Sequence, residues 1–257
     1  MNMNPRQSNV RFSCTALAGT SKQGILPQDP HGYYTMPVGG LNVFNSVGDY
    51  YPYEGAKELF QSSGAFMRRI KTGCLKGEYG HPKMVAGQSM ESFAQRVMTI
   101  EEKNTCVHFS DIWLDFDKVK DETGRPVIAI MAKLKPTGPY GQALEQSLQN
   151  PKEEVCFSIR AFTEDVMQRG TKQRNLREIV SWDFVTEPGL NVARKYKSPA
   201  LESYVDQPVT KEDILGAMKH GQVEGMAMES TRIAGLSLIN ALGWDVTPGK
   251  APHFLNW

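Results

Sequence analysis

The sequence predicts an α+β protein in which an antiparallel β-barrel core is flanked by helices. Three observations support this fold class: a globular composition, four β-rich segments in succession, and helical patterns on both sides of them. Hydrophobic residues make up 40% and charged residues 22% of the 257 residues, which is typical of a folded globular chain. A chain of this length can bury roughly 70–75% of its unfolded surface, in one core or in two small ones.

The N-terminal part of the chain is expected to combine a flexible segment, residues 1–30, with extended segments and helices. Residues 31–47 mix aromatic and β-branched residues with Gly and Pro, which predicts extended segments broken by a turn. Residues 54–70 place apolar side chains at helical spacing, and a shorter amphipathic helix is expected over Ser89–Met98.

The middle of the chain changes to the periodicity of strands. A turn at Gly124–Pro126 separates the first two strands, and a short helix over Gly141–Asn150 separates the second from the third. Strands in such a succession favour an antiparallel sheet or barrel over βαβ units. The four predicted strands are residues 105–117, 126–135, 154–162 and 177–186.

Helical patterns return near the C-terminus. Thr210 and Asp213 form a start that resembles a capping box, and a second apolar helix is expected around residues 226–241. We therefore divide the chain, after the flexible N-terminal segment, into a main domain over residues 31–195 and a C-terminal helical segment and tail over residues 196–257.

Charge and hydropathy exclude several classes of function. The 29 basic and 28 acidic residues give a net charge of +1, so no global field attracts the chain to nucleic acid or to an anionic membrane. No run of 18 apolar residues and no secretory signal are visible. The 4 cysteines are widely spaced, which fits reduced thiols better than a disulfide framework. We expect a soluble intracellular protein that binds neither nucleic acid nor a membrane.

The first candidate for chemistry is His81, in the sequence Gly-Glu-Tyr-Gly-His-Pro at residues 77–82. Gly80 permits an unusual turn, and Pro82 biases the backbone of His81 towards an extended conformation. A rigid, bent loop would present the imidazole as a base, although a surface histidine in a turn is the plainer interpretation.

Two predicted strands carry the other candidates. Cys156, Ser158 and Arg160 share one strand face, where a serine becomes a nucleophile only beside a base and is otherwise an ordinary strand serine. Asp183 is the only acid between Ile179 and Thr186, among mostly apolar strand residues, and needs a partner, either a histidine N–H or backbone N–H groups. Together with His81, these residues would supply the three roles of a hydrolytic triad.

The segments that carry these candidates resemble the prohead maturation proteases of tailed bacteriophages, relatives of the T4-type prohead core protease and the herpesvirus assemblins. The similarity extends over roughly residues 35–190. The matching sequences are GEYGHP at 77–82, VCFSIRAF at 155–162 and SWDFVTEP at 181–188.

This resemblance implies a serine endopeptidase with His81 as base, Ser158 as nucleophile and Asp183 as orienting acid, in an assemblin-like barrel over the main domain. It implies no cofactor or metal. The expected substrates are scaffold or core proteins and the major capsid protein precursor, cut inside the prohead in the host bacterial cytoplasm. Homo-oligomerisation is left open. The alternative is an inactive structural protein of the prohead or scaffold with a protease-like fold.

Two further expectations follow from the resemblance. The herpesvirus branch stabilises the oxyanion with an arginine pair that this chain lacks, so backbone N–H groups and a basic side chain are expected instead. Autoprocessing in the family, together with small-x-Glu sequences here, predicts self-cleavage after Glu202 or Glu229, with Glu202 favoured because it lies in a linker containing proline. The expected oxyanion residues are Gly189, Leu190, Asn191 and Arg194, or Lys195 in place of Arg194.

Three other interpretations compete with or extend the triad. Cys156 could serve as a thiol nucleophile on the face of Ser158, although buried inert thiols are the norm. The basic segment Arg169–Arg177 is interpreted as a solvated hairpin loop or as a site for acidic side chains of the substrate. A zinc site, with unusual ligand spacing, would use Cys74, His81, Cys106 and His108.

Overall fold

A long β-hairpin organises the protein. The computed structural model describes residues 10–18, 26–45, 48–61, 65–117, 127–185, 206–220 and 228–243. Strands β8 (Cys156–Gln168) and β9 (Thr171–Val185) pair antiparallel, and the two residues between them, Arg169 and Gly170, have φ angles of 49° and 78°. Positive φ at both turn residues matches the right-handed twist of hairpin strands. Both strands therefore extend beyond their predicted bounds towards the hairpin tip.

The described strands form two sheets. The six-stranded sheet has the order β10-β1-β8-β9-β4-β3, and the four-stranded sheet has the order β2-β7-β6-β5. Pairing between named strands is antiparallel except between β4 and β9. The remaining strands are β1 (Val10–Ala18), β2 (Tyr34–Leu41), β3 (Val43–Phe44), β4 (Tyr50–Tyr51), β5 (Lys76–Glu78), β6 (Thr105–Asp115), β7 (Ile128–Pro136) and β10 (Asp206–Pro208).

The prediction of mixed helices and strands is confirmed, whereas the predicted closed barrel is not found among the described residues. Strands β3, β5 and β10, at sheet edges, have only two or three residues, so their ladders end early. A single isolated bridge, from Tyr79 to Phe184, connects the end of β5 to β9. A second prediction, a flexible segment over residues 1–30, is wrong for residues 10–18. These residues form strand β1 of the six-stranded sheet.

The helices match the predicted ones closely. The helix expected over residues 54–70 is described as two helices, Tyr53–Gln61 and Ala65–Lys71, and residues 62–64 lie outside the described residues. Thr210 and Asp213 form the predicted capping box: the Asp213 N–H donates to Thr210 Oγ1 at 3.2 Å, and the Thr210 N–H donates to Asp213 Oδ2 at 2.8 Å. The helices are α1 (Tyr53–Gln61), α2 (Ala65–Lys71), α3 (Met90–Met98), α4 (Gly141–Gln149), α5 (Lys211–His220) and α6 (Met228–Ala241), with a short 3₁₀ helix over Glu102–Asn104.

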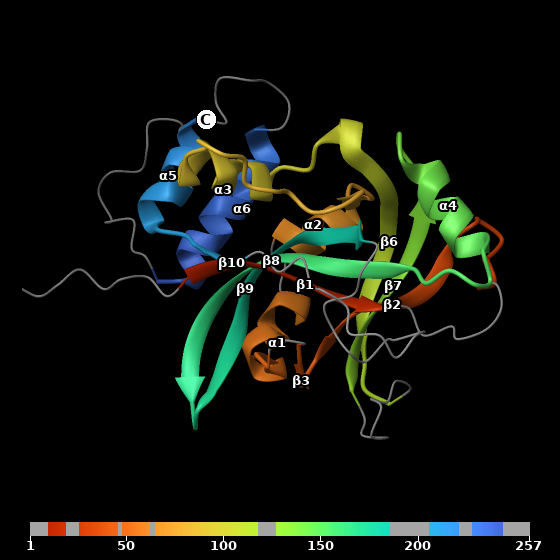
Figure 1. Ribbon diagram of the computed structural model, residues 1–257, viewed down its shortest axis with the longest axis horizontal. Helices are drawn as coiled ribbons and strands as arrows, with labels where there is room; N and C mark the ends of the chain where they lie inside the picture. The colour runs from red at the N-terminus through yellow and green to blue at the C-terminus, as the bar shows by residue number, and fades with distance from the viewer. Residues whose placement is uncertain are drawn as a thin grey trace, which may run out of the picture.

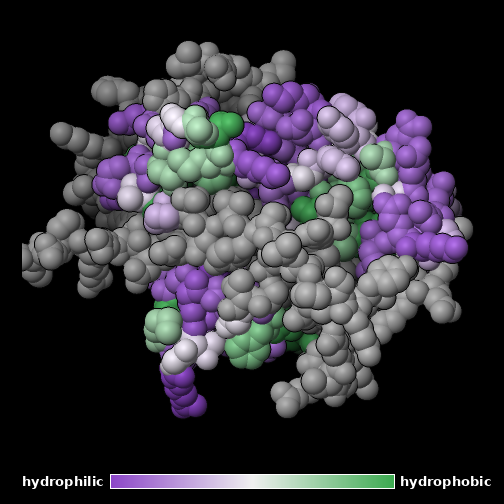
Figure 2. All heavy atoms as spheres, in the orientation of Figure 1, coloured by the Kyte–Doolittle hydropathy of each residue, from purple (hydrophilic) through white to green (hydrophobic). Residues whose placement is uncertain are grey.

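Two large apolar clusters among the described residues hold these elements together. The larger one joins both sheets with α1, α2 and α4, and the smaller one joins α3, α5 and α6 to residues Phe162 of β8 and Val180 of β9. Figure 1 shows α3, α5 and α6 together at one end of the molecule and α4 at the other. Figure 2 shows that hydrophilic side chains dominate the surface over α4. Helices α5 and α6 follow residue 195, where the sequence analysis placed a domain boundary, and they pack on the hairpin.

Candidate active site

Ser158 and Asp183 lie opposite each other near the base of the hairpin. They are register partners on β8 and β9, and Arg160 lies two residues along on the face of Ser158. The opposite face carries Phe157 and Trp182, both fully buried in the larger apolar cluster. The predicted alternation of β8 is therefore confirmed. It places a hydroxyl, a guanidinium and a carboxylate on one polar face.

The His81 loop is fixed to the end of β9 by its glycines. A Cβ atom at Gly77 would lie 2.0 Å from the carbonyl oxygen of Trp182, so only glycine allows β5 to approach β9 this closely. Gly80 has a φ of 79°, and its N–H donates to the Phe184 carbonyl at 2.7 Å. The turn that the sequence predicted before His81 is thus present. It delivers the imidazole to the polar face of the hairpin.

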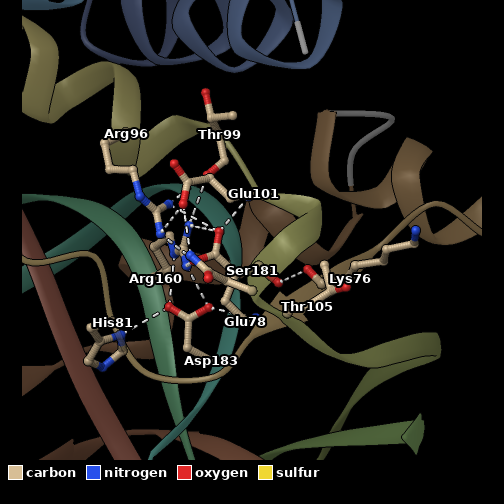
Figure 3. A network of polar contacts seen from close by, with 12 residues as sticks. Lys76, Glu78, His81, Arg96, Thr99, Glu101, Thr105, Arg160, Ser181 and Asp183 are labelled. Carbon is tan, nitrogen blue, oxygen red and sulfur yellow. Dashed lines mark hydrogen bonds and ion pairs between the residues drawn. The ribbon is translucent and has the colours of Figure 1, made fainter. Parts of the chain in front are cut away.

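His81 and Asp183 form a buried hydrogen bond. The Nδ1 atom of His81 lies 3.0 Å from Asp183 Oδ2, and the two side chains are 6% and 0% exposed. Because a carboxylate accepts, Nδ1 carries the hydrogen, and a neutral imidazole then presents Nε2 as an acceptor. Figure 3 shows the ring of His81 at the edge of the network, with a dashed line joining it to Asp183.

Arg160 holds both oxygens of Asp183. Its Nη2 donates to Oδ1 at 2.7 Å and its Nε donates to Oδ2 at 2.8 Å, while the backbone N–H of Glu78 donates to Oδ1 at 3.1 Å. Burial alone would raise the pKa of Asp183, but the Arg160 guanidinium and the hydrogen bond from His81 hold it below its usual value. Asp183 is therefore an ionised, fully bonded carboxylate.

A second carboxylate, Glu78, extends the network towards α3. It accepts from Arg160 Nη1 at 3.3 Å, from Arg96 Nη1 at 3.1 Å and from the backbone N–H of Glu101 at 2.7 Å. The carbonyl oxygen of Thr99 accepts from both arginines, at 3.1 Å from Arg160 and 3.2 Å from Arg96. The two buried carboxylates and two guanidinium groups thus balance each other, as burial requires.

Ser158 lies on the same polar face as Arg160 and Asp183. Its side chain is 1% exposed, and within the described part of the chain no hydrogen bond joins its hydroxyl to His81. Catalytic hydrogen bonds often tighten only when substrate binds. The arrangement can do the chemistry of a base oriented by an acid beside a hydroxyl. The sequence analysis predicted that His81, Ser158 and Asp183 act together, and the structure places all three at one end of the hairpin.

The sequence analysis missed the roles of Arg160, Glu78 and Arg96. The argument that a lone Asp183 in an apolar strand needs a partner applies equally to Arg160, which is the only cation in its strand segment. That signal could have predicted a buried ion pair. It could not have named Glu78 or Arg96, because both are far from Arg160 in the sequence.

The thiol alternative is not favoured by the environment of Cys156. Burial, and secondarily the charge of Glu154, raise the pKa of the Cys156 thiol to about 12, so little reactive thiolate forms near neutral pH. Cys106 is also buried, and its Sγ lies 3.7 Å from the Gly77 carbonyl oxygen.

The zinc alternative is not supported either. His81 is bonded to Asp183, and His108 is bonded through Nδ1 to the Tyr33 hydroxyl at 3.0 Å and through Nε2 to the Gly73 carbonyl at 2.9 Å. Among the residues that the structure describes, no group of three His, Cys, Asp or Glu side chains is arranged to hold a metal ion.

In the same residues, no helix is long and apolar enough to cross a membrane.

The basic segment over residues 169–177 pairs with acids of the chain itself. Lys172 Nζ lies 3.1 Å from Asp49 Oδ2, and Arg174, which is fully buried, also bonds to Asp49. Arg177 Nε donates to Glu164 at 2.9 Å. Residues 171–177 therefore belong to strand β9 and are not the solvated loop that was predicted, and their pairing within the chain disfavours a substrate site.

Several predicted residues fall outside the described part of the chain. These are the oxyanion candidates Gly189, Leu190, Asn191, Arg194 and Lys195, and the cleavage candidate Glu202. The other cleavage candidate, Glu229, is the second residue of α6.

Comparison with known proteins identifies a family and a relative of this chain. The model of the peptidase S80 family matches residues 12–239. A protein of Pseudomonas phage phiKZ named "Capsid maturation protease" is 35% identical over 251 residues, covering 95% of this chain and 92% of its own. The solved structure of the bacteriophage T4 capsid assembly protease, gp21, aligns with a TM-score of 0.46 at 14% identity, covering 70% of this chain and 99% of its own.

Proposed function

Because the chain belongs to the peptidase S80 family, we propose that it is a serine endopeptidase in which His81, Ser158 and Asp183 are base, nucleophile and orienting acid. The observation that carries the proposal is the buried 3.0 Å contact between His81 and Asp183, on the strand face that also bears Ser158. A hydroxyl becomes a nucleophile when an oriented base can take its proton.

The reaction follows from these positions. His81 Nε2 takes the proton of Ser158 Oγ, the oxygen attacks the scissile carbonyl carbon, and His81 returns the proton to the leaving amine. Water then hydrolyses the acyl-enzyme by the same steps. Asp183 keeps the hydrogen of His81 on Nδ1 and stabilises the imidazolium that forms. Donors for the oxyanion remain predicted over residues 189–195.

The substrate class follows from the phage relative. Its name describes a capsid maturation protease, and we extend that role to this chain: it cuts scaffold or core proteins and the major capsid protein precursor inside the prohead, in the cytoplasm of the infected bacterium. An inactive structural protein is the less favoured alternative, because all three residue types of a triad are present and two of them are bonded.

Proteolysis of a scaffold or capsid precursor tests this function. Ser158→Ala and His81→Ala are each expected to reduce cleavage by on the order of 10⁴-fold or more. Ser181→Ala is the matched control, because its hydroxyl, on the partner strand, donates to the Lys76 carbonyl. This control should still cleave. A fluorophosphonate should label the wild type on Ser158 alone.

Two results would reject the proposal. Cleavage by Ser158→Ala at the wild-type rate would exclude Ser158 as the nucleophile. A folded wild type that neither cuts precursor nor accepts the fluorophosphonate would favour the inactive structural protein.

We also propose self-cleavage, with Glu202 favoured over Glu229. A protease binds its substrate in an extended form, and Glu229 would require the start of α6 to open locally first. Intact-mass measurement of wild type and Ser158→Ala would show a product ending at Glu202 in the wild type only. Full-length mass in both, while added precursor is cut, would refute self-cleavage.

A further inference from the structure

Asp183 makes more contacts with Arg160 than with His81. Two of its hydrogen bonds come from the Arg160 guanidinium, at 2.7 and 2.8 Å, and one comes from His81 at 3.0 Å. We propose that Arg160 is a positioning residue that aims Asp183 at His81 and limits how strongly Asp183 favours a protonated His81. This inference rests on the proposed function, since it assigns a role within the same site.

The aiming of Asp183 follows from the fork, the two-pronged contact that the Arg160 guanidinium makes with the Asp183 carboxylate. A guanidinium that donates Nε and Nη2 to two oxygens of one carboxylate fixes the plane of that carboxylate, which a single contact cannot do. Lysine carries the same charge but only a point-like donor, so it cannot replace the fork. With the plane fixed, Oδ2 of Asp183 is held towards Nδ1 of His81.

The Arg160 guanidinium is itself held in place by further hydrogen bonds. The third nitrogen of Arg160, Nη1, donates to the Thr99 carbonyl at 3.1 Å and to Glu78 at 3.3 Å. Glu78 also donates its backbone N–H to Asp183, and it lies three residues before His81 on the same segment. Glu78 therefore links Asp183 to the loop that carries His81, and Arg160 bonds to both Glu78 and Asp183.

The second part follows from the charge balance. Asp183 and Glu78 carry two negative charges, and Arg160 and Arg96 carry two positive charges, within one bonded cluster. A buried carboxylate without a cation would strongly favour an imidazolium beside it, and an imidazolium cannot act as a base. Among the described residues, the charged and titratable groups of the network around His81 and Asp183 are Glu78, Arg96, Glu101, Lys103, Cys106 and Arg160.

Two substitutions of Arg160 separate its effect on the orientation of Asp183 from its effect on the charge balance of the cluster. Arg160→Lys keeps the charge and loses the fork, so the rate of acylation should fall by about 10²-fold while the midpoint of its pH profile stays in place. Arg160→Gln loses both. We expect a similar fall in rate, and the midpoint of the pH profile should move up by about one pH unit, because the uncompensated Asp183 carboxylate then favours the imidazolium.

Two further variants control for general damage. Adding Glu78→Gln to Arg160→Gln restores the net charge of the cluster, so the midpoint should return towards that of the wild type while the rate stays low. Arg174→Gln removes another fully buried arginine of the same hairpin, which bonds to Asp49 and not to the site. It should lower the melting temperature and leave both the rate and the midpoint unchanged.

The readout is the second-order rate constant for acylation of Ser158 by a fluorophosphonate from pH 5 to 9, with folding checked by circular dichroism. A folded Arg160→Gln with the rate and midpoint of the wild type would overturn the inference. If Arg160→Gln does not fold, wild-type acylation by Arg160→Lys would overturn it instead. Absence of Ser158 labelling in the wild type would reject the proposed function, which is a different result from unchanged labelling in the variants.

Discussion

Arg160 and Arg174 are both fully buried on the β8–β9 hairpin, yet their surroundings differ in kind. Arg160, near the hairpin base, bonds to Asp183 and Glu78. Arg174, nearer the tip, bonds to Asp49, with Lys172 also paired to that carboxylate. Both clusters meet the rule that a buried cation needs an anion. A buried ion pair alone therefore does not identify a functional site in this protein.

The difference lies in what each cluster touches. The cluster at the base contacts His81 and lies on the face of Ser158, so it joins fixed charges to an imidazole and a hydroxyl. The cluster at the tip joins carboxylates to Lys and Arg, with no imidazole among its described partners. Only the first contains an imidazole, the side chain most often used as a general base. The neighbouring imidazole, and not the burial, distinguishes the candidate active site.

Matched substitutions of the two carboxylates should give the largest contrast. Asp183→Asn is expected to reduce proteolysis by on the order of 10³–10⁴-fold, because an amide no longer selects the right tautomer of His81. Asp49→Asn should leave proteolysis unchanged and reduce the free energy of unfolding by about 3 kcal/mol, because Arg174 loses its nearest anion. Precursor cleavage and urea denaturation measure the two effects.

The comparison would fail in either of two ways. Full activity in Asp183→Asn would transfer the orienting role to another acid, for which Glu78 is the nearest candidate. Loss of activity in a stably folded Asp49→Asn would make the tip cluster part of the functional machinery.

Local sequence patterns predicted most elements of the fold. The alternation in β8 and the box between Thr210 and Asp213 depend on neighbours within a few residues, and both are present in the structure. Strands β4, β5 and β10 escaped prediction because two or three residues carry no periodicity. The short lengths of the edge strands β3, β5 and β10 also explain why two sheets are found among the described residues in place of the predicted barrel.

The candidate site was only partly predictable for the same reason. Gly80, Ser158 and Asp183 each stood out against their immediate neighbours, through turn chemistry or an isolated polar group in a strand. The contacts of Arg160 with Glu78 and Thr99 cross 82 and 61 residues of sequence. No local pattern encodes such pairings, and only the packing of α3 and β5 against the hairpin creates them.

Glu178 offers a smaller test, because this buried carboxylate of β9 has no guanidinium bonded to it. Its Oε2 accepts from Ser237 of α6 at 2.6 Å, and its Oε1 has no hydrogen-bond partner among the described residues. Burial raises the pKa of Glu178 to about 7 from 4.5, against the opposing effects of Ser237 and Arg69. Between these two values the native state keeps a proton that the unfolded state has lost, so stability falls as pH rises.

Glu178→Gln should remove this pH dependence. Relative to wild type, its free energy of unfolding should increase by about 3 kcal/mol between pH 4.5 and 8, because the loss in the wild type is absent. Urea denaturation across this range measures the effect. Glu54→Gln is the control, since its side chain is 80% exposed and should follow the wild-type curve. Parallel curves for Glu178→Gln and wild type would contradict the assigned ionisation.

The smallest effect is expected at the exposed pair of the hairpin, Arg177 and Glu164, whose side chains are 33% and 37% exposed. An ion pair this accessible contributes about 0–1 kcal/mol, so Arg177→Gln should barely change the unfolding curve.

The pair also tests whether the basic segment recognises acidic substrates. If Arg177 bound a substrate glutamate, Arg177→Gln would slow cleavage after glutamate, whereas Glu164→Gln, by freeing the guanidinium, would accelerate it. We expect neither change in either variant, because Arg177 and Glu164 pair within the hairpin and no contact with substrate is assigned to them.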